Sequence, residues 1–228
     1  MMKHLRHSYI GLVMVFLYMP IAVLILYSFN ASKSRSVWSG FSLRWYRDLF
    51  SNELILTSLY NTLVVALCAS VIAAILGTAA AMGIYSIRNR WFKSMIMNVT
   101  YMPILNPEIV MGVSLLLLFV SVNQIGAGIT AATGIPMPEL NLGYLTLVIA
   151  HVTFCTPYVI LNVLPKLRQM DKFVYEAALD LGCSPVMAFF KVIIPEIMPG
   201  MATGFLMALT YSVDDFIISY FVSSATSQ

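Results

Sequence analysis

The sequence predicts an all-α protein, a polytopic bundle of transmembrane helices, and two observations predict it. Hydrophobic residues make up 60% of the 228 residues and charged residues only 10%, with a mean hydropathy of +0.85. Soluble domains carry about 25% charged residues, so this chain has too little polar surface to face water on all sides. In addition, several apolar runs reach the length of about 20 residues that a helix needs to cross a bilayer.

Five apolar segments are long enough to be membrane spans: 8–29, 57–87, 94–122, 143–164 and 199–222. The first exceeds the apolar region of about 7–15 residues that a cleaved signal peptide has, so we expect it to be retained. The second is rich in alanine and glycine, which allow helices to approach each other closely. The third is interrupted by Pro103 and Pro107, which disrupt helical hydrogen bonding.

The basic residues are distributed unequally between the connecting segments. One side would carry Lys3, Arg6, Arg88, Arg90, Lys93, Lys166, Arg168, Lys172 and Lys191. The other side would carry only Lys33, Arg35, Arg44 and Arg47, because segment 123–142 has no lysine or arginine. Since lysine and arginine accumulate on the cytoplasmic side, the N-terminus and segment 165–198 are predicted to be cytoplasmic. The net charge of +3 is weak and argues against a nucleic-acid partner.

The predicted outer loop, residues 30–56, contains the stretch WSGFSLRWYRDLF. Its aromatic residues Trp38, Trp45, Tyr46 and Phe50 suit the boundary between membrane and water. We therefore expect a short interfacial helix lying flat on the membrane. Anchoring at the interface and a direct role in ligand binding are both open for these aromatic side chains.

Segment 165–198 is polar enough to face water and has a clear helical pattern. Asp171 is a predicted N-cap, and Gly182 is expected to end this first helix in the left-handed conformation. Ser184 can cap a second helix with Pro185 at its first position, and Pro195 should then force a change of direction. The expected product is a pair of short helices. It could fill a groove on a partner protein or lie on the bilayer.

The stretch EAALDLGCSPVMAFFKVIIP within this segment resembles the EAA loop of ABC-importer permeases. The residues that match the pattern at its spacing are Glu176, Ala177, Ala178, Gly182 and Pro195. Val192 and Ile194 stand where the family prefers isoleucine and leucine. Further stretches, among them RWYRDLF, NPEIVMGVSLLLLF and YSVDDFIISYF, look like the polyamine branch, the PotC-type permease subunits of spermidine/putrescine importers.

This resemblance implies that residues 1–228 form one transmembrane permease domain of the type I ABC-importer kind, in a bacterial cytoplasmic (inner) membrane. Segment 165–198 would be the coupling loop that docks into a cytoplasmic ABC ATPase dimer, and cargo would enter the cytoplasm by alternating access. The other implied partners are a homologous second permease subunit and an extracytoplasmic substrate-binding protein. Members of the family commonly have six spans, so a truncated C-terminus would explain the five seen here.

No cofactor is expected in this chain, because it lacks the GxxxxGK[ST] motif that cradles ATP phosphates. ATP and magnesium would bind the partner ATPase. Cys68, Cys155 and Cys183 have no CxxC spacing and are expected to be small core residues rather than metal ligands. No catalytic residue is predicted, so the chain is expected to be a transport subunit and not an enzyme.

Ionisable side chains within spans are costly and usually face a pathway or a partner. Here they are Glu108, His151, Asp214 and Asp215. Glu108 follows two prolines, so it could line a cavity at a broken helix or bond a neighbouring helix. On a continuous helix the two aspartates would point about 100° apart, so one would face the pathway and the other a neighbouring span or subunit. His151 is expected to be neutral and bonded to a hydroxyl group.

The resemblance assigns Trp45, Glu108, Asp214 and Asp215 to the substrate pathway and Glu176 to coupling. Carboxylates and aromatic faces suit a polyamine, a flexible polycation with apolar stretches. An importer of the same architecture could instead carry thiamine, iron or a phosphonate, although the acidic residues weigh against an anionic cargo. A proton-coupled carrier or an intramembrane enzyme is the alternative from a different class.

Overall fold

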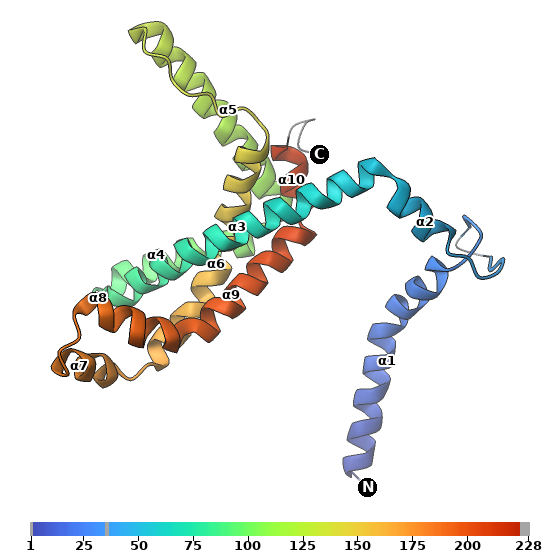
Figure 1. Ribbon diagram of the computed structural model, residues 1–228, viewed down its shortest axis with the longest axis horizontal. Helices are drawn as coiled ribbons and strands as arrows, with labels where there is room; N and C mark the ends of the chain where they lie inside the picture. Colours follow the sequence, from blue (N-terminus) through green and yellow to red (C-terminus); the bar gives the residue numbers. More distant parts are fainter. Residues whose placement is uncertain (1, 35–36, 224–228) are drawn as a thin grey trace. The chain divides into compact units, whose positions relative to one another are not determined.

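The computed structural model describes residues 2–34 and 37–223, whose regular structure is helical apart from one β-bridge between Asn30 and Phe41 (Figure 1). The helices are α1 (Met2–Ser28), α2 (Arg44–Ser51), α3 (Glu53–Ser86), α4 (Arg90–Leu105), α5 (Glu108–Thr133), α6 (Tyr144–Gln169), α7 (Lys172–Asp180), α8 (Pro185–Ala188), the π-helical turn η1 (Phe189–Ile193), α9 (Ile194–Asp214) and α10 (Ile217–Val222). The predicted all-α class is confirmed.

The chain forms two compact units, Met1–Leu59 and Tyr60–Gln228. The first contains α1, α2 and the start of α3. The second contains the rest of α3 and all later helices. The predicted interfacial helix of segment 30–56 corresponds to α2, a short helix without buried residues.

The core of the second unit lies where α3, α6 and α9 meet. Its buried residues are Ala73, Ala81, Ile84, Cys155, Val159, Ile160, Val163, Leu164, Leu167, Ile197 and Ala208. Glycine makes the close approach possible: a Cβ added at Gly77 would lie 2.6 Å from the Val159 Cβ, and one at Gly204 would lie 3.0 Å from the Val159 Cα. The small residues therefore act as expected, by bringing helix backbones together.

A smaller core joins α5, α6 and α10 and consists of Leu115, Phe119, Ala150, Ile218 and Val222. A Cβ added at Gly112 of α5 would lie 2.9 Å from the Phe221 Cδ2, so this contact also depends on a glycine. Thr146 of α6 donates a hydrogen bond to the Val222 carbonyl at 3.3 Å. α10 is thus held by both neighbouring helices.

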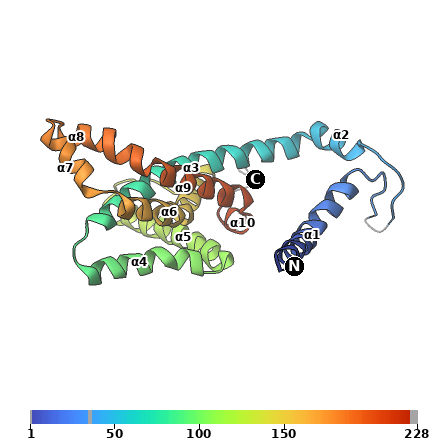
Figure 2. The same ribbon diagram turned by 90° about the horizontal axis from the view of Figure 1, so that it is seen from below.

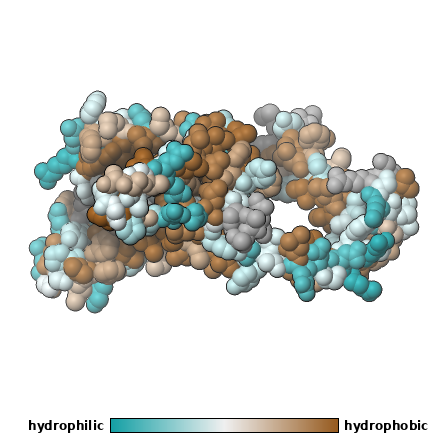
Figure 3. Space-filling view, turned by 90° about the horizontal axis from the view of Figure 1, so that it is seen from above, coloured by the Kyte–Doolittle hydropathy of each residue, from teal (hydrophilic) through white to brown (hydrophobic). Residues whose placement is uncertain are grey.

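Five helical segments of the described chain are long and apolar enough to cross a membrane: His7–Ser28, Glu53–Ser86, Glu108–Thr133, Tyr144–Gln169 and Pro185–Asp214. Large apolar side chains are exposed on most of these helices, and Figure 3 shows apolar side chains over much of the visible face. Apolar surface on this scale requires lipid or other subunits around it. The predicted number of spans is confirmed, but two of their positions are wrong.

The third predicted span, 94–122, is divided between two helices. α4 ends at Leu105, and α5 begins at Glu108 after Pro107, which lacks the amide that a continuous helix would need. α5 then runs to Thr133, although 123–142 was expected to be a loop. Within its polar end, the hydroxyl groups of Thr130 and Thr133 donate to carbonyls four residues earlier, at 3.0 and 2.7 Å, so these side chains find partners inside the helix.

The fifth predicted span, 199–222, is also wrong in its limits. Helical backbone starts at Pro185 and continues to Asp214, where it breaks before α10. Pro195 does not end the helix, because it lies in the first turn of α9, directly after the π-helical turn η1. The ribbon turns between α8 and α9, so the expected change of direction occurs within a continuous helical path (Figure 1).

The cysteines behave differently from one another. Cys155 is buried in the main core as expected, and Cys183 is half-buried. Cys68 is exposed on α3, so its assignment to the core was wrong. Its position on an apolar helix places it on a surface that suits lipid or another subunit rather than water.

Candidate functional site

The first candidate region is the α7–α8 knob, residues 171–188, which is built by local capping. The Asp171 carboxylate accepts from the Phe173 amide at 3.0 Å, and Ser184 Oγ accepts from the Met187 amide at 3.3 Å. Gly182 has φ 87°, and the amides of Gly182 and Cys183 donate to the carbonyls of Leu179 and Ala178. This pair of bonds is a Schellman motif, which ends α7 where the glycine was expected to end it.

The knob presents an unusual surface for a segment outside the apolar spans. Glu176, Ala177 and Gly182 are exposed, and Ala178 is half-buried. Around them lie large exposed apolar side chains: Phe173, Val174, Leu181, Val186, Met187 and Phe190. Figures 1 and 2 both place α7 and α8 at the end of the second unit opposite α10. A surface with small residues amid exposed apolar ones suits contact with another protein.

The second candidate region is a cavity of about 100 Å³ in the second unit, here called the acidic pocket. It lies between the α4–α5 break, α6 and the α9–α10 break. Its lining residues are Pro103, Ile104, Asn106, Glu108, Met111, Phe154, Tyr158, Tyr211, Asp215 and Ile218. Two predicted pathway residues, Glu108 and Asp215, thus line one cavity although they are far apart in sequence.

Aromatic side chains complete the acidic pocket. The rings of Tyr158 and Tyr211 are stacked with centroids 4.3 Å apart, and Phe154 lies on the same lining. Tyr158 was not predicted, because its only signal was a tyrosine after a proline within an apolar span. Carboxylates beside aromatic faces form a surface that attracts organic cations through charge pairing and cation–π contacts.

Asp215 lines the acidic pocket and also caps α10. Its carboxylate accepts from the amides of Ile218 at 3.2 Å and Ser219 at 2.9 Å, and from the Ser219 hydroxyl at 2.9 Å. Asp215 itself has extended backbone, with φ −70° and ψ 117°, so the two aspartates are not neighbours on one helix as expected. Asp214 is exposed and does not line the pocket.

Glu108 lies in the first turn of α5 and is exposed. A carboxylate at this position is favoured by the partial positive charge of the helix N-terminus. Glu108 was expected inside a long span, whereas it lies directly after the break at Asn106 and Pro107. The expectation of a broken helix beside a cavity holds, since Asn106 and Glu108 both line the acidic pocket.

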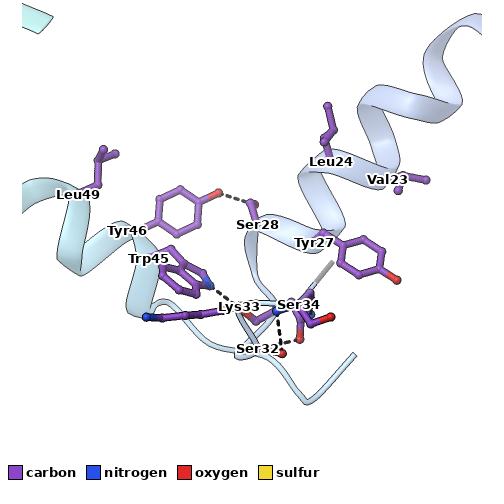
Figure 4. Close-up of a pocket in the computed structure, with 11 residues that line it drawn as sticks. Val23, Leu24, Tyr27, Ser28, Ser32, Lys33, Ser34, Trp45, Tyr46 and Leu49 are labelled. Carbon is purple, nitrogen blue, oxygen red and sulfur yellow. Dashed lines mark hydrogen bonds between the residues drawn. The ribbon is translucent and has the colours of Figure 1, made fainter. Parts of the chain in front are cut away.

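Trp45 belongs to the first compact unit and holds its loop together. Its Nε1 donates to the carbonyl of Asn30 at 2.8 Å, while the buried Asn30 side chain bonds the backbone of Val37 and Ser39. Trp45 and Tyr46 line a separate cavity of about 640 Å³ with residues of α1 and the following loop (Figure 4). The Tyr46 hydroxyl and Ser28 Oγ are 2.7 Å apart. The bond to Asn30 gives Trp45 a structural role in its own unit, and its role in the substrate pathway stays a prediction.

His151 is bonded to hydroxyl groups, as predicted. Its Nδ1 lies 2.6 Å from Ser212 Oγ and its Nε2 lies 3.0 Å from Ser219 Oγ. Although serine, histidine and aspartate meet here, His151 is 2% exposed and Ser212 1% exposed, and neither lines the acidic pocket. Among the described residues, no group of three or more histidine, cysteine or acidic side chains could hold a metal ion.

The five long apolar helices indicate a multi-pass membrane protein. The chain belongs to the family described as binding-protein-dependent transport system inner membrane component, which it matches over residues 73–226. This family supplies the permease subunits of ABC importers, so the chain is a permease subunit of this kind in a membrane, not an enzyme.

Two bacterial relatives are similar in sequence to this protein over most of the chain. It is 41% identical over 209 residues to the putrescine transport system permease protein PotI of Escherichia coli K12, covering 91% of this chain and 70% of that protein. It is 35% identical over 222 residues to the spermidine/putrescine transport system permease protein PotC of Haemophilus influenzae, covering 97% of this chain and 80% of that protein.

A solved transporter structure has a similar fold. A chain of a bacterial ABC transporter involved in the import of the acidic polysaccharide alginate matches with a TM-score of 0.72 and 14% identity. The match covers 99% of this chain and 78% of that one. At this identity the similarity concerns the fold alone.

Proposed function

We propose that this permease subunit carries polyamines, putrescine or spermidine, into the bacterial cytoplasm by alternating access. The observation that carries the proposal is the acidic pocket, in which Glu108 and Asp215 share one lining with the stacked Tyr158 and Tyr211. The relatives named for putrescine and spermidine transport support the same class of cargo.

The chemistry of the pocket fits an elongated organic cation. Ammonium groups would pair with the carboxylates, and the apolar methylene chain would lie along the tyrosine rings. An anionic cargo such as a phosphonate would meet the negative charge of Glu108 and Asp215. Thiamine remains a candidate cation, and it is distinguished from a polyamine by direct competition for uptake.

The α7–α8 knob is the proposed coupling element, with Glu176, Ala177, Ala178, Gly182 and Pro195 at or near its contact surface. It would dock into a cytoplasmic ABC ATPase dimer that binds ATP and magnesium. Because helical backbone continues from Pro185 to Asp214, movement of the knob would reach the α9–α10 break beside the acidic pocket. A homologous second permease would supply the other half of the pathway, and an extracytoplasmic binding protein would deliver cargo.

The proposed location is the cytoplasmic membrane with a cytoplasmic N-terminus, supported by the asymmetry of lysine and arginine. In that orientation the knob faces the cytoplasm, where ATP is available. The alternative of a proton-coupled carrier does not hold, because the family consists of permease subunits of ABC importers. Uptake should therefore depend on ATP.

The test is uptake of radiolabelled spermidine by proteoliposomes that hold the complete complex. Glu108→Gln removes a charge with little change of shape, so we expect the KM to rise about tenfold, the usual effect of losing a charge-assisted hydrogen bond. The matched control is Glu139→Gln, which changes an exposed carboxylate outside the pocket. If the KM stays unchanged in Glu108→Gln, the pocket does not bind the cargo.

A further inference from the structure

A buried polar cluster lies behind the acidic pocket and joins three helices. It consists of His151 of α6, Ser212 of α9, Asp215 at the α9–α10 break and Ser219 of α10. His151 Nε2 lies 3.0 Å from Ser219 Oγ and 3.6 Å from the Asp215 Oδ2. The side chains of His151 and Asp215 are only 2% and 3% exposed. Glu108, the other carboxylate of the described pocket lining, is exposed.

The protons of the cluster can be assigned by counting donors and acceptors. An ionised carboxylate only accepts, and it lies closer to Ser219 Oγ than the Asp215 carbonyl does, at 2.9 Å against 3.2 Å, so we assign the single hydroxyl proton of Ser219 to Asp215 Oδ2. Ser219 Oγ then accepts from His151, which places the histidine proton on Nε2. His151 Nδ1 is left as an acceptor, so the Ser212 hydroxyl donates to it at 2.6 Å.

A neighbouring contact supports this direction of the bonds. A serine within a helix often donates to the carbonyl four residues earlier, which for Ser212 is that of Ala208. The Cys155 thiol already donates to this carbonyl at 3.3 Å. The Ser212 proton is therefore directed across to His151, and the chain of donors runs from α9 through α6 to the carboxylate of Asp215.

We infer that His151 is a positioning residue that holds the Asp215 carboxylate in the acidic pocket, an inference that rests on the proposed cation pathway. His151 donates to Ser219, which donates to Asp215, and the other histidine nitrogen accepts from Ser212 of α9. Its ring also lies against Phe154, with centroids 5.3 Å apart, and Phe154 lines the same pocket. His151 thus supports two lining residues without touching the cargo.

The position of Ser212 gives this support a second consequence. Ser212 lies in α9 near the end of the continuous helix that starts at the α7–α8 knob. A shift of this helix that separates Ser212 from His151 would leave the histidine nitrogen without its donor and loosen the support of Asp215. His151 therefore connects the conformation of α9 to the placement of the acceptor for the cation.

The test compares two variants in the reconstituted complex. His151→Gln keeps an N–H donor that reaches toward Ser219 and Asp215, whereas His151→Leu removes it at similar volume. We expect the KM for spermidine uptake to rise about tenfold in His151→Leu, as for the loss of a hydrogen bond to a charged group. It should stay within about threefold of wild type in His151→Gln, since the donor is retained.

A double-mutant cycle with Asp215→Asn shows whether His151 acts through Asp215. In the Asp215→Asn background, His151→Leu should add no further rise in KM, because the carboxylate that it positions is gone. Ser219→Ala gives a milder second variant, since Asp215 keeps its backbone amide donors. Its KM should rise by about threefold to tenfold with the amount of assembled complex unchanged.

Two results would overturn the inference, and a third would overturn the proposed cargo. An unchanged KM in Ser219→Ala and His151→Leu, with only the maximal rate lowered, would mean that the cluster only stabilises the fold. A full additional KM rise in the Asp215→Asn background would also overturn the inference. Absence of spermidine uptake by the wild-type complex would overturn the proposed cargo.

Discussion

The α7–α8 knob and the acidic pocket are built in opposite ways. Every hydrogen bond cited for the knob joins residues that are close in sequence, and the side chains at its tip are exposed. The acidic pocket depends on contacts between α4, α5, α6, α9 and α10, and the carboxylate of Asp215 is enclosed. A substitution on the knob should therefore disturb a partner contact, whereas one at the pocket disturbs binding and helix placement together.

The largest expected effect is in the acidic pocket. Asp215→Asn should raise the KM for spermidine uptake about a hundredfold. The substitution removes the charge that pairs with the cation, and it leaves the buried hydrogen-bond donors around residue 215 without a charged acceptor. Asp214→Asn is the matched variant, since Asp214 is exposed and outside the lining. Its KM should stay within about threefold of wild type.

This pair of aspartates also tests the geometry of the helix break. Equal effects of the two substitutions on KM would mean that both carboxylates face the pathway. A larger effect at Asp214 would show that the pathway passes the other face of α9, and the assignment of the pocket would then be wrong.

The knob should respond differently. Ala177→Trp puts a large side chain at an exposed position, so the chain should fold normally but lose contact with the ATPase. We expect uptake to fall more than about tenfold, as for steric exclusion from the centre of an interface, with co-purification of the ATPase reduced. Ala132→Trp, at an exposed alanine of α5, is the control and should leave co-purification of the ATPase unchanged.

A packing prediction sharpens the contrast between interior and surface. Gly77→Ala places a Cβ 2.6 Å from that of Val159 and should lower stability in detergent by about 1–3 kcal/mol. Gly83→Ala in the same helix has nothing within 4 Å of the new methyl group and should not destabilise the protein. Thermal unfolding followed by gel filtration measures both, and equal stability would contradict the close contact of α3 with α6.

The smallest expected effect is at the end of α7. Gly182→Ala forces an alanine into the left-handed conformation, with φ 87°, at a cost of about 1 kcal/mol. Because the knob is locally built, limited proteolysis within residues 171–188 should become faster while the melting temperature of the whole protein changes little. A large loss of global stability would show that the knob is part of the core.

The knob could be predicted from sequence because its signals are local. Asp171, Gly182, Ser184 and Pro185 each specify a cap or a turn within a few residues, and the structure has each where it was expected. The number of spans followed from composition, since long apolar runs have few alternatives in a bilayer.

The acidic pocket could be predicted only in part. Glu108 and Asp215 stood out as charges in apolar surroundings, but nothing in the sequence placed them on one cavity or added Tyr158 to it. The end of α9 at Asp214 was missed although Asp215 accepts from amides only three and four residues later, because this local cap lies within an apolar run. The contact of Asp215 with His151 could not be predicted, since it forms only after the helices have packed. The role of Trp45 in its loop was missed for the same reason, since its partner is a backbone carbonyl 15 residues away.

The central claim is that the α7–α8 knob and the acidic pocket are two ends of one helical path that connects ATP hydrolysis to cation transport. The most direct measurement is ATP hydrolysis by the complex in proteoliposomes, with and without spermidine and the binding protein. Wild type and Asp214→Asn should be stimulated, whereas Asp215→Asn and Ala177→Trp should both lose the stimulation. Stimulation of these two variants at the wild-type level would contradict the claim.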